Sequence, residues 1–171
     1  HPMEMQTYLF DLLEKAGAKH AMKLVGARAQ NWLRQEKSYR AFGNELGRDA
    51  TPVEADLPRF IDLEKEFHGK DAMIAMGIRS KCVTVLIDGP PDADPWGREA
   101  LYDMQSNRIG RLTSGGYSVA FGTSIGMGYV TPQMAQAGTQ VQVKMFDRLW
   151  PARITEDSPY DPQNAAIRVD G

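Results

Sequence analysis

Residues 108–130 read RIGRLTSGGYSVAFGTSIGMGYV, and this stretch decides between a phosphate-binding loop and a β-structure. Glycine-rich loops bind phosphates when a helix begins just after the glycines. The residues after Gly115 and Gly116 are instead β-branched and aromatic, with further glycines between them, which favours strands joined by turns. Because adjacent glycines readily adopt positive φ, the pair is predicted to form the bend of a hairpin. The alternative is a bend that also lies against a ligand or another domain.

The spacing of apolar residues along the chain changes near residue 78, from a helical repeat before it to a two-residue repeat after it. From residue 79 onward, short segments alternate apolar and polar residues and are separated by turn residues, as in KCVTVLID (81–88), TQVQVKMF (139–146) and LWPARIT (149–155). This spacing is typical of a small antiparallel barrel or sandwich. The fold class predicted is therefore α+β, with an N-terminal helical and αβ part followed by an antiparallel β-barrel-like C-terminal domain.

Helical spacing dominates the first part of the chain. The pattern predicts helices over 4–17 and 26–43, a third helix after Gly69, and a short strand over 21–25. Pro52 and Pro58 predict a loop between the second and third helices. The predicted division is 3–78 for the helical part, 79–157 for the barrel and 158–171 for an extended tail.

Composition excludes several classes of partner. The 171 residues carry 20 Lys and Arg against 22 Asp and Glu, without a block of like charge, so neither nucleic acid nor a membrane is expected as a partner. The single Cys82 allows no internal disulfide, and no Cys/His cluster has metal-ligand spacing, so no metal site is predicted. No apolar run approaches the roughly 20 residues of a membrane-spanning helix, and a reducing compartment is expected.

The residues that could carry chemistry form no recognisable catalytic motif. His20 and His68 lie outside any nucleophile motif, and Cys82 lies in an apolar segment where a thiol is usually inert. A charged cluster with an aromatic ring has the helical spacing for pairing along one face, although a solvated face of ion pairs explains it equally well. The cluster consists of Arg34, Glu36, Lys37, Tyr39 and Arg40. The catalytic residues stay unknown at this level.

Six segments in order resemble the second half of the glycine-cleavage T-protein family of folate-dependent aminomethyltransferases. The resemblance runs from about residue 24 to 155, and six matches in one order are far more specific than any one. Within that superfamily, LRQEKSYRAFG (33–43) and DADPWGREALY (92–102) look most like the folate-binding region of dimethylglycine and sarcosine dehydrogenases. The six segments are LRQEKSYRAFGNELGRDATPVEADL (33–57), EFHGKDA (66–72), LIDG (86–89), RIGRLTSGGYS (108–118), IGMGYV (125–130) and GTQVQVKMFDRLWPARI (138–154).

The resemblance implies a protein that transfers a one-carbon unit from a methylated amine or glycine-derived donor to tetrahydrofolate. Folate is the implied ligand, and the implied macromolecular partner is the missing N-terminal half of the module or a dehydrogenase domain or subunit. FAD would be held only by a fused domain of a longer parent, and the segment 1–171 is expected to be inactive by itself. The implied compartment is the cytoplasm of a bacterium or the mitochondrial matrix of a eukaryote.

The resemblance also carries site residues onto this sequence. Tyr39 falls where the family places an aromatic residue beside the folate. Gln30 falls where the T-proteins have an arginine, so a neutral amide replaces a charged clamp on the folate carboxylates. Arg34 and Glu36 match the family's LRxE pattern and are equally well explained as structural ion-pair residues. The resemblance places TSGGYS (113–118) in the C-terminal barrel, as a turn that helps it dock.

Two other functions remain open on this sequence. A tetrahydrofolate-dependent demethylase of the same superfamily would act on an O-methyl or S-methyl donor, and Gln30 is one sign of such altered chemistry. A non-catalytic folate-binding or docking module would use the barrel for docking alone. The parent's preceding sequence would separate the three, because a dinucleotide-binding motif there favours the amine-linked enzyme.

Overall fold

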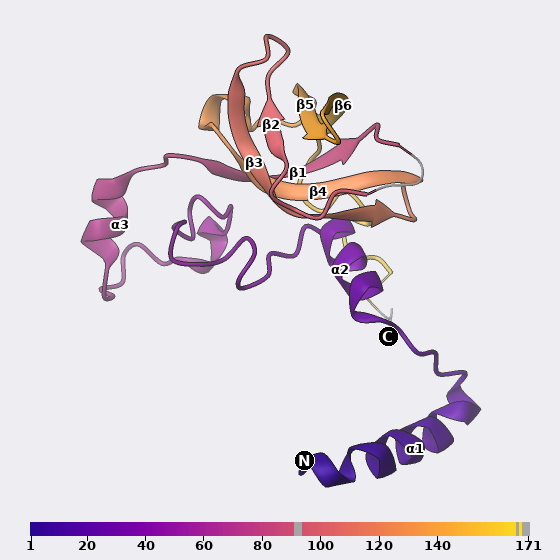
Figure 1. Ribbon diagram of the computed structural model, residues 1–171. Coiled ribbons are helices and arrows are strands. Elements are labelled where there is room, and N and C mark those ends of the chain that lie inside the picture. The colour runs from indigo at the N-terminus through magenta and orange to yellow at the C-terminus, as the bar shows by residue number, and fades with distance from the viewer. Residues whose placement is uncertain (91–93, 167, 169–171) are drawn as a thin grey trace. The chain divides into compact units, whose positions relative to one another are not determined.

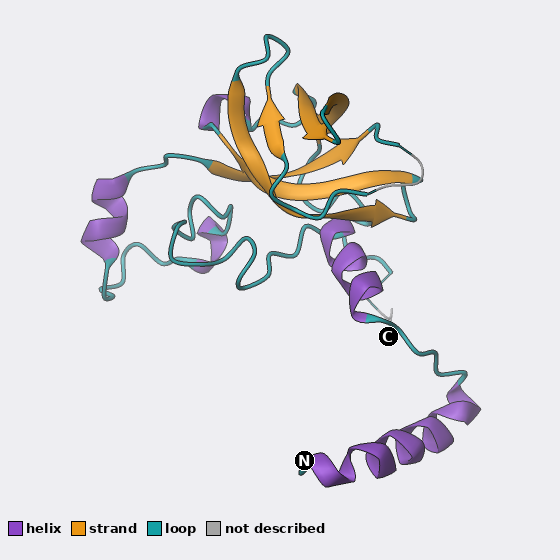
Figure 2. Cartoon of the chain, viewed as in Figure 1, coloured by secondary structure: helices purple, strands orange, loops and turns teal. Residues whose placement is uncertain are grey.

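The computed structural model describes residues 1–90, 94–166 and 168, and its chain forms two compact units (Figure 1). The first unit comprises residues 1–30 and the second residues 31–171. In the second unit the helices precede the strands, apart from one short 3-10 helix, η4 (Pro132–Met134) (Figure 2). The α+β class predicted from the sequence is confirmed.

The first unit has no buried residue in its helices. It contains η1 (Met3–Met5), α1 (Gln6–Gly17) and η2 (Ala18–His20), and α1 ends near Gly17 as predicted. The strand predicted over 21–25 is absent. A strand requires a partner for its backbone hydrogen bonds, and no described strand of this chain pairs with that segment.

The helix predicted over 26–43 is shorter in the structure. α2 spans Ala27–Glu36, and Ser38 then adopts φ 53°, a left-handed conformation that ends the helix. Lys37, Tyr39 and Arg40 therefore lie beyond the helix, and the predicted pairing along one helical face is wrong for them. Turns and η3 (Pro58–Phe60) follow, and α3 (Lys70–Met76) begins after Gly69 as predicted.

Six antiparallel strands close into a barrel in the second unit (Figure 1). The order around the barrel is β1-β4-β3-β2-β5-β6, and β1 closes it by pairing with both β4 and β6. Because the sheet is closed, the paired strands leave no free edge. The strands are β1 (Lys81–Ile87), β2 (Ala100–Tyr102), β3 (Arg108–Ser118), β4 (Thr123–Val130), β5 (Gln140–Met145) and β6 (Arg148–Ile154).

The barrel interior is the hydrophobic core of the chain. Alternate residues of the strands point inward, so Val83, Val85 and Ile87 of β1 join Leu101, Leu112 and Val143 in one buried cluster. β1 and β4 are also buried on their outer sides, as the four consecutive buried residues 82–85 show. The outer sides of these strands are therefore covered by another part of the chain. Residues 31–56 form this covering segment.

Gly115 and Gly116 do not form a hairpin bend, which corrects the sequence-based prediction. They lie within β3, opposite Gly126 and Ile125, and the turn comes four residues later at 119–122, where Gly122 has φ 64°. A Cβ at Gly116 would overlap the indole of Trp32, and one at Gly115 would overlap the backbone of Pro95. The glycines thus give the covering segments close access to β3 rather than bending the chain.

No helix among the described residues is long and apolar enough to cross a membrane. The same residues contain no group of three or more His, Cys, Asp or Glu side chains that could hold a metal ion. The tail after β6 runs through turns between residues 157 and 166 and is hydrogen-bonded to the covering segment through Ser158 and Tyr160.

Candidate functional site

The outer faces of β1, β3 and β4 carry a layer of buried polar side chains, contributed by the strands and by residues 35–54. A buried polar side chain is costly unless it is hydrogen-bonded, and most members of this layer bond across to the other element. The layer therefore fixes the covering segment to the barrel. Its members are Gln35, Glu36, Ser38, Glu45, Glu54, Thr84, Ser114 and Ser118.

Arg34 and Glu45 form the ion pair at the centre of this layer. Their Nη1 and Oε2 atoms are 2.8 Å apart, and the Glu45 side chain is fully buried. The other oxygen of Glu45 accepts bonds from the hydroxyls of Thr113 (2.7 Å) and Ser114 (2.5 Å), while the amide of Ala41 donates to Oε2 at 3.0 Å. Both oxygens of this buried carboxylate accept hydrogen bonds, so the carboxylate holds the 41–46 loop on β3.

Arg34 makes hydrogen bonds to both the amide and the carbonyl of the Tyr39 backbone. Its amide donates to the carbonyl of Arg34 at 2.8 Å, and its carbonyl accepts from Nη1 of Arg34 at 2.9 Å. The residue as a whole is 51% exposed. Arg34 thus fixes the backbone position from which the Tyr39 side chain projects. The side chain itself is not part of the core.

Glu36 anchors two other segments rather than forming an ion pair. Its carboxylate accepts from the Ser118 hydroxyl at 2.6 Å and from the Ala120 amide at 3.1 Å, which holds the turn between β3 and β4. Its backbone carbonyl accepts from the amide of Tyr160 at 3.0 Å, which holds the tail. Arg34 thus forms an ion pair with Glu45, whereas the described partners of the Glu36 carboxylate are a hydroxyl and a backbone amide.

The remaining charged residues of the cluster bond to distant parts of the chain. Arg40 contacts Asp157 at 2.7 Å and Asp56 at 3.4 Å, and Lys37 contacts Asp161 at 3.6 Å. These partners lie 16 to 124 residues away along the chain, so no helical spacing could have identified them.

Gln30, the fourth residue taken from the resemblance, lies exposed on the part of α2 that belongs to the first unit. The structure thus brings Tyr39, Arg34 and Glu36 together in the second unit. Sequence reasoning missed Glu45, whose role depends on β3, and Trp32, whose ring lies on Gly116 and meets Tyr117 edge-on at 6.4 Å.

The nucleophile candidates are unsuited to chemistry. Burial raises the pKa of the Cys82 thiol to about 12, against a smaller opposing effect of the nearby Arg40 guanidinium. The thiol is therefore protonated at neutral pH and unreactive. His20 and His68 are both exposed.

A small cleft of about 260 Å³ opens beside the Arg34–Glu45 pair. It lies between the 43–50 loop and the outer face of β3 and β4, and its lining includes Glu45, Arg111 and Tyr129. The Tyr129 hydroxyl donates to the backbone carbonyl of Glu45 at 2.7 Å, which adds another link between this loop and the barrel. The candidate site therefore consists of the hydrogen-bonded 41–46 loop, the half-exposed Tyr39 that precedes it, and the cleft beside the 43–50 loop.

Known proteins are similar to this chain in sequence and in fold. Residues 81–161 match the family model of the glycine cleavage T-protein C-terminal barrel domain, and residues 1–65 match that of the GCVT N-terminal domain. The crystal structure of the glycine cleavage system aminomethyltransferase T from Bartonella henselae superposes with a TM-score of 0.79 at 26% identity, over 89% of this chain and 44% of that one.

Two sequence relatives agree with the family models. Mitochondrial dimethylglycine dehydrogenase of Mus musculus is 33% identical over all of this chain, which spans 20% of that protein. An aminomethyltransferase of Caldanaerobacter subterraneus is 32% identical over 93% of this chain, which spans 43% of it. The chain belongs to the glycine cleavage T-protein family and includes its C-terminal barrel.

Proposed function

We propose that the chain is part of a tetrahydrofolate-dependent aminomethyltransferase, which transfers a one-carbon unit from a methylated amine or glycine-derived donor to tetrahydrofolate. Family membership supports folate-dependent one-carbon transfer in general. The names of the two relatives, a dimethylglycine dehydrogenase and an aminomethyltransferase, favour a donor in which nitrogen carries the carbon. Because the chain spans less than half of either relative, the activity belongs to a larger assembly.

The observation that carries this proposal is the exposed ring of Tyr39 on a fixed backbone. Tyr39 is half-exposed while Arg34 holds its backbone amide and carbonyl, so the ring projects from a fixed backbone position and is suited to stack on a flat ligand. Tetrahydrofolate would supply the nitrogen that accepts the one-carbon unit. In this proposal Tyr39 contacts the pterin, Gln30 offers an amide to the folate, and Arg34 and Glu36 hold the ligand-facing segment in place.

The second candidate is a demethylase of the same superfamily with an O-methyl or S-methyl donor. Gln30 favours it, because a neutral amide where relatives of the T-protein type have a cation indicates altered chemistry. The partners proposed for either function are folate and the remaining half of the module, or a dehydrogenase domain that carries FAD. The proposed compartment is the bacterial cytoplasm or the mitochondrial matrix.

The Tyr39→Ala variant tests the folate site. We would combine the chain with the preceding portion of the Caldanaerobacter aminomethyltransferase and measure tetrahydrofolate binding by calorimetry. Loss of a stacked ring should weaken binding about fivefold, which corresponds to about 1 kcal/mol. The matched control is Tyr160→Ala, since that ring is 45% exposed but lies in the tail. Equal affinities for Tyr39→Ala and the unmodified chain would exclude Tyr39 from the site.

A further inference from the structure

Residues 58–78, the apolar segment, carry many apolar side chains and bury none of them. Ten of the 21 residues are apolar, and every residue of the segment is partly or largely exposed. On the surface of a folded chain exposed apolar residues normally occur singly, and a larger group of them marks an interaction surface. The exposed large side chains of the segment are Phe60, Leu63, Phe67, Ile74, Met76 and Ile78.

The composition of the apolar segment is that of a folded protein rather than of a disordered stretch. Disordered segments contain few aromatic and large apolar residues, whereas nearly half of this segment is apolar. Its helix α3 has seven residues, none of them buried, and an isolated helix of that length is marginal in water. The segment therefore requires packing against something outside it.

Both ends of the apolar segment are fixed at one place beside β1. The buried carboxylate of Glu54 accepts hydrogen bonds from the amide of Arg79 at 3.0 Å and from its guanidinium at 2.9 Å. The backbone carbonyl of Glu54 accepts from the amide of Cys82 in β1 at 2.7 Å. The segment thus leaves and rejoins the barrel at a fixed base, with its exposed side chains between the two ends.

The first 78 residues supply almost none of the apolar core. All of them lie in the described part of the chain, and Ala55 is the only buried apolar residue among them. The other buried apolar residues begin at Cys82 and belong to the strands of the barrel. Because a domain forms around a hydrophobic core, residues 1–78 need further polypeptide to complete one.

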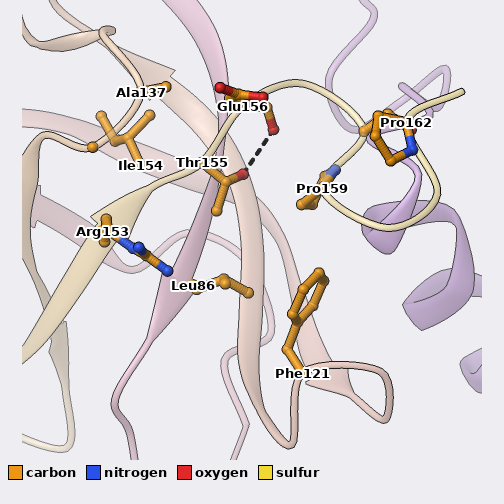
Figure 3. A pocket seen from close by; sticks show the side chains of 11 residues that line it. Leu86, Phe121, Ala137, Arg153, Ile154, Thr155, Glu156, Pro159 and Pro162 are labelled. Atoms are coloured by element: carbon orange, nitrogen blue, oxygen red, sulfur yellow. Dashed lines mark hydrogen bonds between the residues drawn. The ribbon is translucent and has the colours of Figure 1, made fainter.

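The surface of the barrel differs from the apolar segment, because parts of the same chain gather its apolar side chains. Figure 3 shows a pocket at β1 and β6 that Phe121, from the turn before β4, lines together with Leu86 and the tail prolines. The carboxylate of Glu36 holds that turn, and its backbone carbonyl holds the tail. No part of the described chain buries the apolar segment in a comparable way.

Similarity to known proteins favours one occupant for this surface. Residues 1–65, which include Phe60 and Leu63, match the family model of the GCVT N-terminal domain. The superposed aminomethyltransferase of Bartonella henselae is longer, since this chain covers 44% of it. A second copy of this chain would add another set of residues without a core, whereas the preceding portion of the module would add more of the same domain.

We propose that the preceding portion of the aminomethyltransferase module packs on the apolar segment and buries Phe60. This inference rests on the proposed function, in which the chain works with the remaining half of the module. The test fuses the preceding portion of the Caldanaerobacter aminomethyltransferase to the N-terminus of the chain and follows amide hydrogen exchange. The amides of 58–78 should exchange at least about 100-fold more slowly in the fused protein than in the 171-residue chain, since a packed segment exchanges only when it opens.

Phe60→Ala and Phe146→Ala form a matched pair of variants, because both residues are 73% exposed in the chain. Burial of a phenylalanine side chain is worth a factor of about ten or more, so Phe60→Ala should speed exchange of the apolar segment about tenfold in the fused protein. Phe146→Ala, in the turn between β5 and β6, should change it less than about twofold. Equal effects of the two variants, or an unprotected segment beside a protected barrel, would overturn the proposal.

Two further measurements separate the remaining outcomes. Protection of the 171-residue chain that rises with its concentration would make a second copy the occupant and overturn the proposal. If the barrel loses protection in the fused protein, the preceding portion is added as a separate polypeptide and the same outcomes apply. Tetrahydrofolate binding is measured on the same samples: a protected segment without binding contradicts the proposed function alone, and binding with an unprotected segment contradicts this inference alone.

Discussion

Gly116 shows how one residue sets the distance between the covering segment and the barrel. It lies in β3 under the indole of Trp32, where an added Cβ would overlap a ring carbon. Overpacking of this kind costs about 1–3 kcal/mol, so Gly116→Ala should lower the free energy of unfolding in urea by that amount. The control is Gly47→Ala, whose Cβ would meet nothing within 4 Å. Equal stability of the two variants would show that Trp32 does not constrain β3.

Glu54 provides a second test at the residue scale, through pH. Hydrogen bonds from Arg79 are the main cause that lowers the pKa of Glu54 to about 2 from 4.5, against the opposing effect of burial. A folded-state pKa below the unfolded one contributes stability above the unfolded value, and this contribution is lost as the pH falls. The stability gap between the unmodified chain and Glu54→Gln should be about 1–2 kcal/mol at pH 7, since Arg79 is half-exposed.

That gap should close between about pH 4.5 and pH 2, measured by urea unfolding at each pH. Glu66→Gln is the matched control, because the Glu66 side chain is 88% exposed and pairs only with Lys70 on the surface. A gap that stays constant down to pH 2 would mean that the Arg79–Glu54 contact does not contribute to folding.

At the scale of elements, α1 depends for its stability on interactions within its own segment, whereas the barrel depends on contacts between strands. α1 has exposed apolar residues on several sides, including Tyr8, Phe10 and Leu13, and none of its residues is buried. An isolated helix of about 12 residues is marginal in water. Deleting residues 1–25 should therefore change the thermal midpoint of the barrel by less than about 2 °C.

Deleting the tail from Asp157 onward is the contrasting variant. It removes one of the two ion-pair partners of Arg40 and the backbone bonds from Ser158 and Tyr160, so it should lower the midpoint clearly. Thermal melts followed by far-ultraviolet circular dichroism compare the two deletions. A large loss from the first deletion would contradict the expectation that residues 1–25 do not stabilise the barrel.

Helices and strands could be predicted from the sequence where the spacing of apolar residues within the segment is enough to determine them. α1, α3, β1, β5 and β6 follow from 3.6- and 2-residue spacing, and the succession of short strands predicts an antiparallel barrel or sandwich. The glycine pair was wrongly assigned because its cause is Trp32, more than 80 residues earlier in the chain. The segment 21–25 has the pattern of a strand, but a strand also depends on a partner that the pattern does not contain.

The candidate site was predictable only through family resemblance. Tyr39 and Arg34 came from matched motifs, while nothing local in the sequence distinguishes Glu45 from the other carboxylates of the chain. The two hydrogen bonds that it accepts from Thr113 and Ser114 exist only once β3 and the 41–46 loop are brought together. Long-range polar contacts of this kind determine the site geometry, and periodicity carries no information about them.

At the scale of the whole molecule, the proposed reaction requires more than this chain supplies. One-carbon transfer depends on holding the pterin and stabilising charge at the reacting nitrogen, and preorganised groups do this only in a site closed around the ligand. In the proposed site the described residues would supply one wall, with Tyr39 at its surface, and the chain spans 43% of the Caldanaerobacter aminomethyltransferase. We expect the 171-residue chain to fold, to bind tetrahydrofolate weakly, and not to catalyse.

The measurement is formation of methylenetetrahydrofolate from formaldehyde above the spontaneous rate. The chain is assayed alone and after mixing with the preceding portion of that aminomethyltransferase as a separate polypeptide. Activity should appear only in the mixture, because only there can groups from both halves surround the pterin. Tyr39→Ala should reduce that activity and Tyr160→Ala should not, which separates a failed assembly from a misplaced site. Turnover by the chain alone would contradict the division of the site, since a complete site would then lie within residues 1–171.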